Sequence, residues 1–196
     1  MFRTSLICPL IISVLLLAVM LLPATWQALL EYQLGAIGEG EVWRFIGGHL
    51  VHLGWGHLLM NLLGFWLIWE LFLSNRMPAE ICLFGLTLLT LCVSLGLYLL
   101  SPDIEWYRGF SGVLHGLLVW ALLRELHLHP LSSGLILALV VVKLLLEQYF
   151  GALPGSESLA KGRVIVDAHL YGGLAGALVW GLEKRFPKFK KTEVTE

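Results

Sequence analysis

The sequence predicts an all-α polytopic membrane protein: one domain, residues 1–196, with six transmembrane helices and both termini in the cytoplasm. Hydrophobic residues make up 58% of the chain, charged residues only 14%, and the mean hydropathy is +0.81. A soluble fold of this length cannot bury so much apolar surface, so part of its solvent must be lipid. The apolar runs are too long and too unalternating for barrel strands, which leaves helices as the structure that spans the bilayer.

The six predicted spans cover approximately residues 6–30, 56–73, 80–100, 111–126, 131–150 and 164–183. The first run could also be a secretory signal peptide, because Arg3 precedes it and small residues follow Pro23. Its apolar core is long for a signal peptide and five further hydrophobic segments follow, which favours a retained first span.

Arginine and lysine in the loops predict the orientation, because cytoplasmic loops carry an excess of them. With the N-terminus inside, eight basic residues fall on the inner side and four on the outer side. The inner residues are Arg3, Arg76, Arg124, Lys184, Arg185, Lys188, Lys190 and Lys191. The outer residues are Arg44, Arg108, Lys161 and Arg163. We therefore expect both termini in the cytoplasm.

Cysteine spacing and charge limit the cofactors and partners. Cys8, Cys82 and Cys92 lie inside apolar runs, their number is odd, and no pairing spacing appears, so we expect buried free thiols. No H-E-x-x-H or comparable zinc spacing occurs, and we expect neither a metal centre nor a cofactor. The net charge of −1, without a basic patch, argues against a nucleic-acid partner.

Three sets of polar residues are predicted to lie at one depth, in the outer third of the membrane. The second, fourth and sixth spans all run from outside to inside. They begin with His57 and Asn61, with Ser111 and His115, and with His169, respectively. Any one set could simply hydrogen-bond a neighbouring helix. However, intramembrane histidines are rare and usually face the bundle interior, so three sets at one depth favour a common polar site.

The fourth span is too short to cross the hydrocarbon core. About 15 residues at ~1.5 Å each give ~22 Å, against a core of ~30 Å. Ser111 should therefore lie at a submerged helix N-terminus, whose free N–H groups and dipole favour negative charge. Gly112 and Gly116 on this span, with Gly172 and Gly176 on the sixth, would let the two backbones approach closely.

These residues give the chain a resemblance to the rhomboid intramembrane serine proteases. The motifs follow the family's order along essentially the whole chain. They are the outer-loop pair Trp43 and Arg44, the H-x4-H-x3-N set of His52, His57 and Asn61, the G-x-S-G set of Gly109, Ser111 and Gly112, and the H-x2-G-x3-G set of His169, Gly172 and Gly176.

The resemblance implies a Ser–His dyad without a third acidic member. Ser111 would be the nucleophile, and His169 the general base and later the general acid. His57, Asn61 and the Ser111 backbone N–H would hold the oxyanion of the tetrahedral intermediate. The long first outer loop would lie partly in the outer leaflet as a structural element. The fifth span and the loop after it would form a gate and a cap over the site.

His115 departs from the commonest family pattern, in which a tyrosine at this position packs against the catalytic histidine. This form, on a minimal six-helix chain, resembles the rhombosortase branch. That branch is implied to process bacterial proteins with a C-terminal Gly-Gly motif, a hydrophobic helix and a basic tail. His115 shares a helical face with Ser111 and is itself a candidate base. We favour His169, which can approach across a helix interface, and expect His115 to stack on it or tune it.

Other polar residues have both a structural and a functional interpretation. Asp167 lies two residues before His169, a separation at which helical side chains diverge, so a cap or loop contact is favoured over orienting the histidine. Lys143 and Glu147 on the fifth span are spaced for a local ion pair, with contact to a charged substrate or gate motion as the alternative. His52 is expected to stabilise the first outer loop.

The sequence therefore predicts a serine endopeptidase of the bacterial inner membrane, with its active site toward the periplasmic side. Its partners would be the lipid bilayer and a single-pass transmembrane protein substrate that enters sideways. The alternatives are a general rhomboid protease with other substrates, an inactive rhomboid-like protein that binds membrane clients, and a small transporter with a histidine relay. The intact Ser111 and His169 argue against an inactive protein, and the lack of an inverted repeat argues against a transporter.

Overall fold

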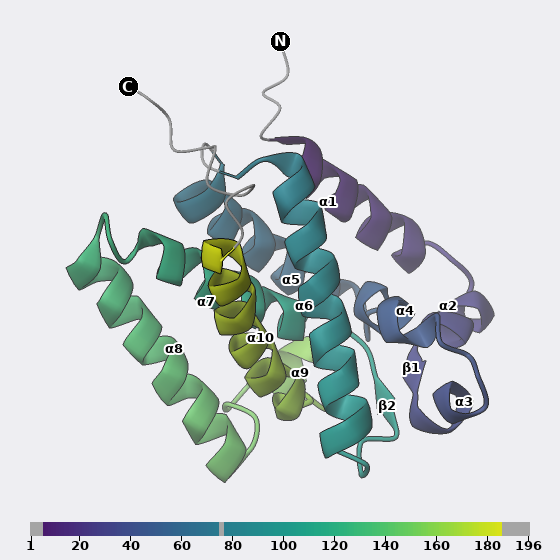
Figure 1. The fold of residues 1–196 in the computed structure, drawn as a ribbon. Coiled ribbons are helices and arrows are strands. Elements are labelled where there is room, and N and C mark those ends of the chain that lie inside the picture. Colours follow the sequence, from purple (N-terminus) through teal and green to yellow (C-terminus); the bar gives the residue numbers. More distant parts are fainter. Residues whose placement is uncertain (1–5, 75–76, 186–196) are drawn as a thin grey trace.

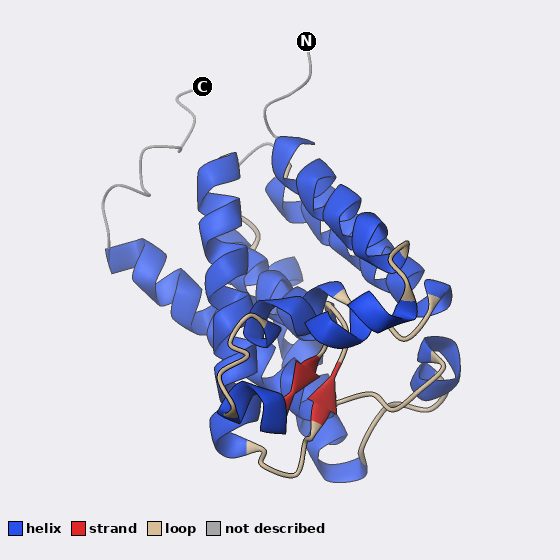
Figure 2. Cartoon of the chain, turned by 90° about the vertical axis from the view of Figure 1, so that its right-hand side faces the viewer, coloured by secondary structure: helices blue, strands red, loops and turns tan. Residues whose placement is uncertain are grey.

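The protein is a bundle of helices with one short two-stranded sheet at its edge, in a computed structural model that describes residues 6–74 and 77–185 (Figures 1 and 2). The elements in chain order are α1 (Ile7–Met20), α2 (Ala24–Leu30), β1 (Tyr32–Gln33), α3 (Leu34–Gly38), α4 (Arg44–Leu50), α5 (Trp55–Ile68), the π-helix η2 (Trp69–Leu73), α6 (Ala79–Leu100), β2 (Trp106–Tyr107), α7 (Ser111–Glu125), α8 (Pro130–Phe150), α9 (Ser156–Ala160) and α10 (Val166–Arg185).

The five predicted segments from residue 56 onward coincide with helices to within two residues at each end. The α5–η2 helix, α6 and α8 are long and apolar enough to cross a membrane, and α1 is a shorter apolar helix. At 15 residues, α7 is shorter than a full membrane crossing requires. The chain is thus a mostly helical, multi-pass membrane protein.

The first predicted segment is not one helix. α1 ends at Met20, and α2 begins directly after Pro23. Proline lacks an N–H and its ring clashes with the preceding turn, so a helix cannot run through this position undisturbed. The Gln27 side chain donates hydrogen bonds to the carbonyl oxygens of Met20 (3.2 Å) and Leu22 (2.9 Å), which satisfies groups that the broken helix leaves open. The prediction of a continuous helix over residues 6–30 is therefore wrong.

The segment between α2 and α5 is joined to the chain that leads into α7. Tyr32 of β1 pairs with Tyr107 of β2 in antiparallel register, and both side chains are buried. Gly109 donates its N–H to the Gly48 carbonyl oxygen of α4 at 3.0 Å. Gly48 has no room for a side chain, because a Cβ there would lie 2.7 Å from the Tyr32 Cβ. The first loop thus supports the start of α7 directly.

Trp43 and Arg44 fasten the same segment to α2. The buried Arg44 side chain donates to the carbonyl oxygens of Ala28 (2.8 Å) and Glu31 (2.7 Å). The Trp43 indole N–H donates to the Leu29 carbonyl oxygen at 3.0 Å. Backbone carbonyls at the end of a helix have no intrahelical partners, so these side chains satisfy groups that would otherwise be orphaned. Both residues therefore have a structural role: they hold the first loop against the end of α2.

α7 and α10 form the centre of the bundle, with α6, α8 and α5 around them (Figure 1). Glycines form their interface. A Cβ at Gly172 would collide with the Gly112 carbonyl oxygen, and one at Gly176 with the Gly116 carbonyl oxygen. Small residues at such positions let helix backbones approach closely in a membrane. The first turns of α7 and α10 are thereby held side by side.

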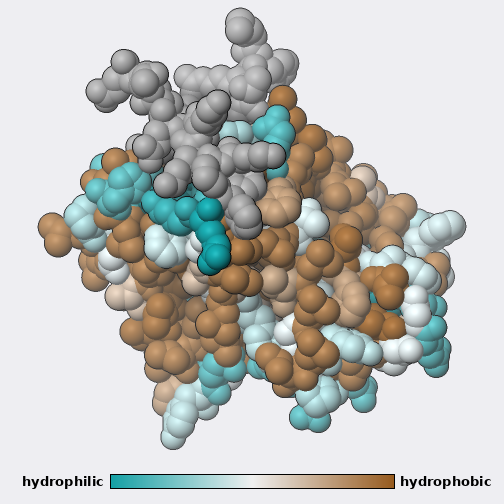
Figure 3. Space-filling view, viewed as in Figure 1, coloured by the Kyte–Doolittle hydropathy of each residue, from teal (hydrophilic) through white to brown (hydrophobic). Residues whose placement is uncertain are grey.

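The outside of the bundle is apolar. On the face shown in Figure 3, hydrophobic residues form a broad band, and hydrophilic residues gather at its lower edge and beside the upper ends of the helices. α8 contributes an exposed apolar row at helical spacing, formed by Leu131, Leu135, Leu139, Val142 and Leu145. A surface of this kind is suited to hydrocarbon rather than water.

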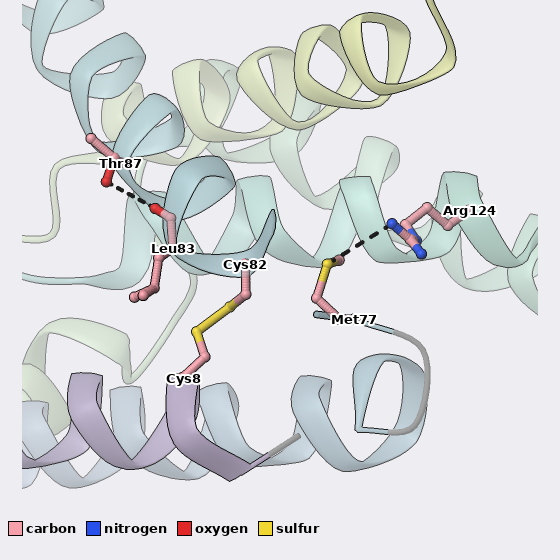
Figure 4. Close-up of a disulfide and its surroundings, with 6 residues drawn as sticks. All are labelled: Cys8, Met77, Cys82, Leu83, Thr87 and Arg124. Carbon is pink, nitrogen blue, oxygen red and sulfur yellow. Dashed lines mark hydrogen bonds between the residues drawn. A yellow bond between two sulfur atoms is a disulfide. The ribbon is translucent and has the colours of Figure 1, made fainter. Parts of the chain in front are cut away.

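Cys8 of α1 and Cys82 of α6 form a disulfide (Figure 4). The prediction of free thiols is therefore wrong for this pair, whereas Cys92 is free and partly buried. The two bonded cysteines are 74 residues apart in sequence, so no local spacing could indicate the pairing. Their Cα atoms lie 6.6 Å apart because the first turns of α1 and α6 are neighbours. The bond ties α1 to the bundle.

The beginning of α1 and the end of α10 lie at the same end of the bundle (Figure 1). An even number of membrane crossings requires this arrangement. Of the basic residues that predict the orientation, five fall outside the residues that the structure describes: Arg3, Arg76, Lys188, Lys190 and Lys191.

Candidate active site

Polar residues from four helices line a cavity of about 240 Å³ at the starts of α7 and α10. The sets predicted on the second, fourth and sixth spans all reach this cavity, and α8 contributes a further pair. The wall also includes residues 153–165, around the short helix α9. The polar lining from these four helices is His57 and Asn61 of α5, Ser111 and His115 of α7, Lys143 and Glu147 of α8, and His169 of α10. Polar residues outside these helices also line the cavity: Tyr107, Arg108, Ser156 and Arg163.

Ser111 and His169 meet across the interface of α7 and α10. Ser111 is the first residue of α7, and its Oγ lies 3.0 Å from His169 Nε2. His169 is buried in the first turns of α10. The neighbouring backbones are close, since a Cβ at Gly112 would lie 2.8 Å from the Ala168 carbonyl oxygen. The geometry is that of a nucleophile beside a proton acceptor.

Gly109 makes the turn that presents Ser111. Its φ of +132° belongs to a region that side chains disfavour, and glycine adopts it readily. A Cβ at this position would also lie 2.7 Å from Cε1 of the His57 ring. Any larger residue would therefore displace the ring or the turn. Gly109 fixes both the start of α7 and the place of His57 beside it.

His57 and Asn61 hold polar atoms that lack partners. The Asn61 Nδ2 and His57 Nδ1 atoms are buried, and neither makes a hydrogen bond to any residue that the structure describes. Buried polar groups are nearly always paired, so two such atoms beside one cavity need a physical explanation. The Asn61 amide nitrogen is a donor. An unpaired donor at such a cavity is suited to an oxyanion that forms only during a reaction.

Glu147 brings a carboxylate to the far side of the His169 ring. Its Oε2 atom lies 2.9 Å from His169 Nδ1 and 2.7 Å from the Lys143 ammonium, and the side chain is only 2% exposed. The i, i+4 ion pair with Lys143 agrees with the sequence. The contact with His169 was not foreseen, although a carboxylate within a membrane helix is itself a signal of function.

His115 stacks on His169, with ring centroids 4.2 Å apart and planes inclined by 21°. Its Nδ1 lies 2.8 Å from the Ser111 carbonyl oxygen, and its Nε2 lies 2.9 Å from Lys143 Nζ. A carbonyl oxygen only accepts and an ammonium only donates, so in this network Nδ1 carries the proton and Nε2 is the acceptor. Both ring nitrogens are occupied, which leaves His169 as the histidine that faces the Ser111 hydroxyl.

Asp167 points away from the cavity. Its Oδ2 accepts a hydrogen bond from the Ser101 hydroxyl at 2.5 Å, and the Tyr171 hydroxyl lies 2.7 Å from the same oxygen of Ser101. Asp167 therefore links the start of α10 to the end of α6, and it does not contact His169. The loop contact favoured by the sequence is the one present.

His52 belongs to the loop that supports the cavity. Its ring packs against His57 at 5.1 Å between centroids, and its Nδ1 lies 3.2 Å from the Leu50 carbonyl oxygen. Burial, with a smaller effect of the nearby His57 ring, lowers the pKa of His52 to about 3. A neutral, packed ring supports its neighbour rather than reacting.

His49, which the sequence analysis did not single out, forms a hydrogen bond with Ser94 Oγ at 2.8 Å and is likewise buried.

His115, Glu147 and His169 could hold a metal ion by distance alone, because their ligand atoms lie within 4.8 Å of one another. The Lys143 ammonium is already within hydrogen-bond distance of two of the three. A divalent cation at this position would meet that positive charge at close range. The donor set is better matched to the lysine than to a metal.

The fold and the cavity define a class of protein: a multi-pass helical membrane protein with a serine–histidine pair at a polar site. Residues 39–184, about three quarters of the chain, match the Rhomboid domain family. The chain belongs to the rhomboid family, a family of intramembrane serine proteases. No curated protein matches the chain.

Proposed function

We propose that this protein is an intramembrane serine endopeptidase in which Ser111 and His169 act as the catalytic dyad. The observation that carries the proposal is the 3.0 Å contact between Ser111 Oγ and His169 Nε2. It lies at a cavity that also holds the unpaired Asn61 amide nitrogen. A nucleophile, a base and an unused donor together are what acyl transfer requires.

The first half of the reaction forms an acyl-enzyme. Ser111 Oγ bonds to the carbonyl carbon of the scissile peptide, and its proton moves to His169 Nε2. The π electron pair moves to the carbonyl oxygen, where Asn61, His57 and the Ser111 backbone N–H donate hydrogen bonds. When the C–N bond breaks, His169 returns the proton to the leaving amine. The substrate acyl group remains as an ester on Ser111.

The second half releases the product. A water molecule loses a proton to His169 Nε2 and its oxygen bonds to the ester carbon. The C–O bond to Ser111 then breaks, and the serine oxygen takes the proton back from His169. One peptide bond and one water molecule are consumed, and the enzyme is regenerated without a cofactor.

In the membrane, we propose six crossings formed by α1, the α5–η2 helix, α6, α7, α8 and α10. Both termini would lie in the cytoplasm of a bacterial inner membrane, with the cavity toward the periplasmic side. The common end of α1 and α10 in Figure 1 and the exposed apolar row of α8 support this arrangement. The substrate would be a single-pass membrane segment that enters sideways from lipid, and glycine near the scissile bond would help it unwind.

We further propose that the enzyme is a rhombosortase-type rhomboid protease. Its substrates would be proteins that end in a Gly-Gly motif, a hydrophobic helix and a basic tail. His115 supports this assignment, because it occupies the position of the usual tyrosine and stacks on His169 at 4.2 Å. Cleavage near the glycines would release a protein on the outer face of the membrane.

The test uses the purified full-length chain in liposomes. We expect a fluorophosphonate probe to label the wild-type protein and to leave Ser111→Ala unlabelled. Mass spectrometry should find a new C-terminus near the glycines of a substrate with the proposed tail. A matched substrate with both glycines changed to leucine should be cleaved more slowly. Equal cleavage of both substrates would refute the rhombosortase assignment, and cleavage by Ser111→Ala would refute the mechanism.

A further inference from the structure

We propose that Glu147 is a positioning residue for this reaction: it fixes the orientation and tautomer of His169 and stabilises its charged form. The inference rests on the proposed function, because it assigns His169 the role of base. It extends the Ser–His dyad to a Ser–His–Glu triad, with the carboxylate supplied by α8, a different helix from those of Ser111 and His169.

The contacts define which ring nitrogen carries the proton. A carboxylate oxygen only accepts hydrogen bonds, so the 2.9 Å contact with Glu147 Oε2 places the proton of neutral His169 on Nδ1. The lone pair of Nε2 then faces Ser111 Oγ at 3.0 Å. Without an acceptor at Nδ1, the ring could carry its proton on Nε2, and in that tautomer it could not take the serine proton.

The charge of Glu147 matters at the moment of proton transfer. When His169 receives the Ser111 proton at Nε2, the ring becomes positively charged within a buried site. A carboxylate 2.9 Å away offsets this charge, and the attraction is stronger in a water-poor interior than in solvent. The Nδ1 proton stays on the ring, and the carboxylate is not protonated at any step.

Lys143 explains how a carboxylate can remain ionised in this place. An isolated buried charge is very unfavourable, whereas a paired and hydrogen-bonded one is tolerated. The ammonium lies 2.7 Å from Glu147 Oε2 and 2.9 Å from His115 Nε2, and the lysine side chain is 31% exposed. With both histidines neutral, the network carries no net charge. The proton taken up during catalysis is then balanced by the substrate oxyanion.

A local ion pair alone would not require this arrangement. Lys143 and Glu147 could pair on the exposed face of α8, where that helix carries its apolar row. Instead, Glu147 is 2% exposed and reaches His169, a residue 22 positions away on another helix. Asp167, the acid nearest to His169 in sequence, binds Ser101. Glu147 is therefore the carboxylate that the fold places beside His169, the proposed base.

The experiment compares Glu147→Gln with the wild type in liposomes, with kcat and KM measured separately. Loss of the carboxylate charge leaves Lys143 unbalanced beside the forming imidazolium. We expect kcat to fall about 10²-fold or more with little change in KM, since removing the acid of a serine triad has effects of this order or larger. Glu183→Gln is the matched control: it removes another ion-paired carboxylate, on α10, and should keep the wild-type kcat.

Glu147→Ala separates positioning from folding. The truncated side chain leaves space beside the cavity, so sodium formate should restore part of the lost activity, whereas equimolar sodium chloride should not. A structural role would not respond to formate. Wild-type kcat in Glu147→Gln would overturn the inference. So would an inactive Glu147→Ala that formate does not reactivate and that unfolds at a lower temperature.

The two proposals fail in different ways. If Ser111→Ala and His169→Ala abolish cleavage but Glu147→Gln does not, the role of Glu147 is refuted and the dyad stands. If Ser111→Ala still cleaves, the proposed function itself is refuted.

Discussion

Two cavities in the described part of the chain are similar in size but opposite in chemistry. The first, of about 240 Å³, is the polar cavity at the starts of α7 and α10. The second, of about 270 Å³, lies between α6, α7 and α10 and has an almost wholly apolar wall that includes Phe84, Leu88 and Val179. At its border, Glu183 accepts a hydrogen bond from the Trp120 indole at 2.8 Å and pairs with Arg124. Size alone therefore does not identify the functional cavity.

The polar atoms distinguish the two regions. Around the second cavity, the Glu183 carboxylate is shared between two donors, which is how buried polar groups usually stabilise a fold. In the first cavity, the Asn61 amide nitrogen and His57 Nδ1 have no partner among the described residues. Leaving a buried donor unpaired costs about 1–3 kcal/mol. The Asn61 amide nitrogen is therefore available to a ligand of the polar cavity, whereas the Glu183 carboxylate at the apolar cavity is already paired.

The largest effect should come from His169 in the polar cavity. We expect His169→Ala to lower the single-turnover cleavage rate by about 10⁴-fold or more, because the serine loses its proton acceptor. His115→Tyr should stay within about tenfold of the wild type, because an aromatic ring can keep the stacking contact. Single-turnover assays with one substrate would measure both. Retained cleavage in His169→Ala, with loss in His115→Tyr, would transfer the role of base to His115.

A smaller effect is expected for Asn61→Ala. Removing one oxyanion donor should lower kcat by about 10²–10³-fold and leave KM nearly unchanged. The thermal unfolding midpoint should not fall through loss of a hydrogen bond, because the amide nitrogen has no partner to lose. Kinetics and thermal unfolding in the same detergent would test both halves. A large loss of stability with a normal kcat would make Asn61 a structural residue, like those around the apolar cavity.

The sequence predicted much of this arrangement because the relevant signals are local. Helical spacing and the order of the spans predicted that His57, Ser111 and His169 would meet, and all three line one cavity. Apolar run lengths predicted the helices from residue 56 onward. At the first break the local signal is Pro23 itself, which ends α1 and begins α2, so the run over residues 6–30 is two helices.

The remaining features depend on tertiary contacts that leave no local pattern. The i, i+4 spacing indicated the pair of Lys143 and Glu147, but only the rotation and depth of α8 bring Glu147 to His169. The partner of Cys8 is likewise set by how α1 packs against α6. Such contacts depend on how whole helices are placed, which spacing within one helix cannot determine.

The smallest effect on activity should come from the apolar cavity, through Glu183→Gln. Its kcat should match the wild type, because the carboxylate pairs with Arg124 and Trp120 and does not line the polar cavity. The change should lower stability by about 1–2 kcal/mol, since both ion-pair partners are only partly buried and solvent screens them. That loss corresponds to a fall of a few degrees in the unfolding midpoint. A lowered kcat at unchanged stability would mean that the second cavity also contributes to catalysis, and paired polar atoms would then no longer distinguish the two regions.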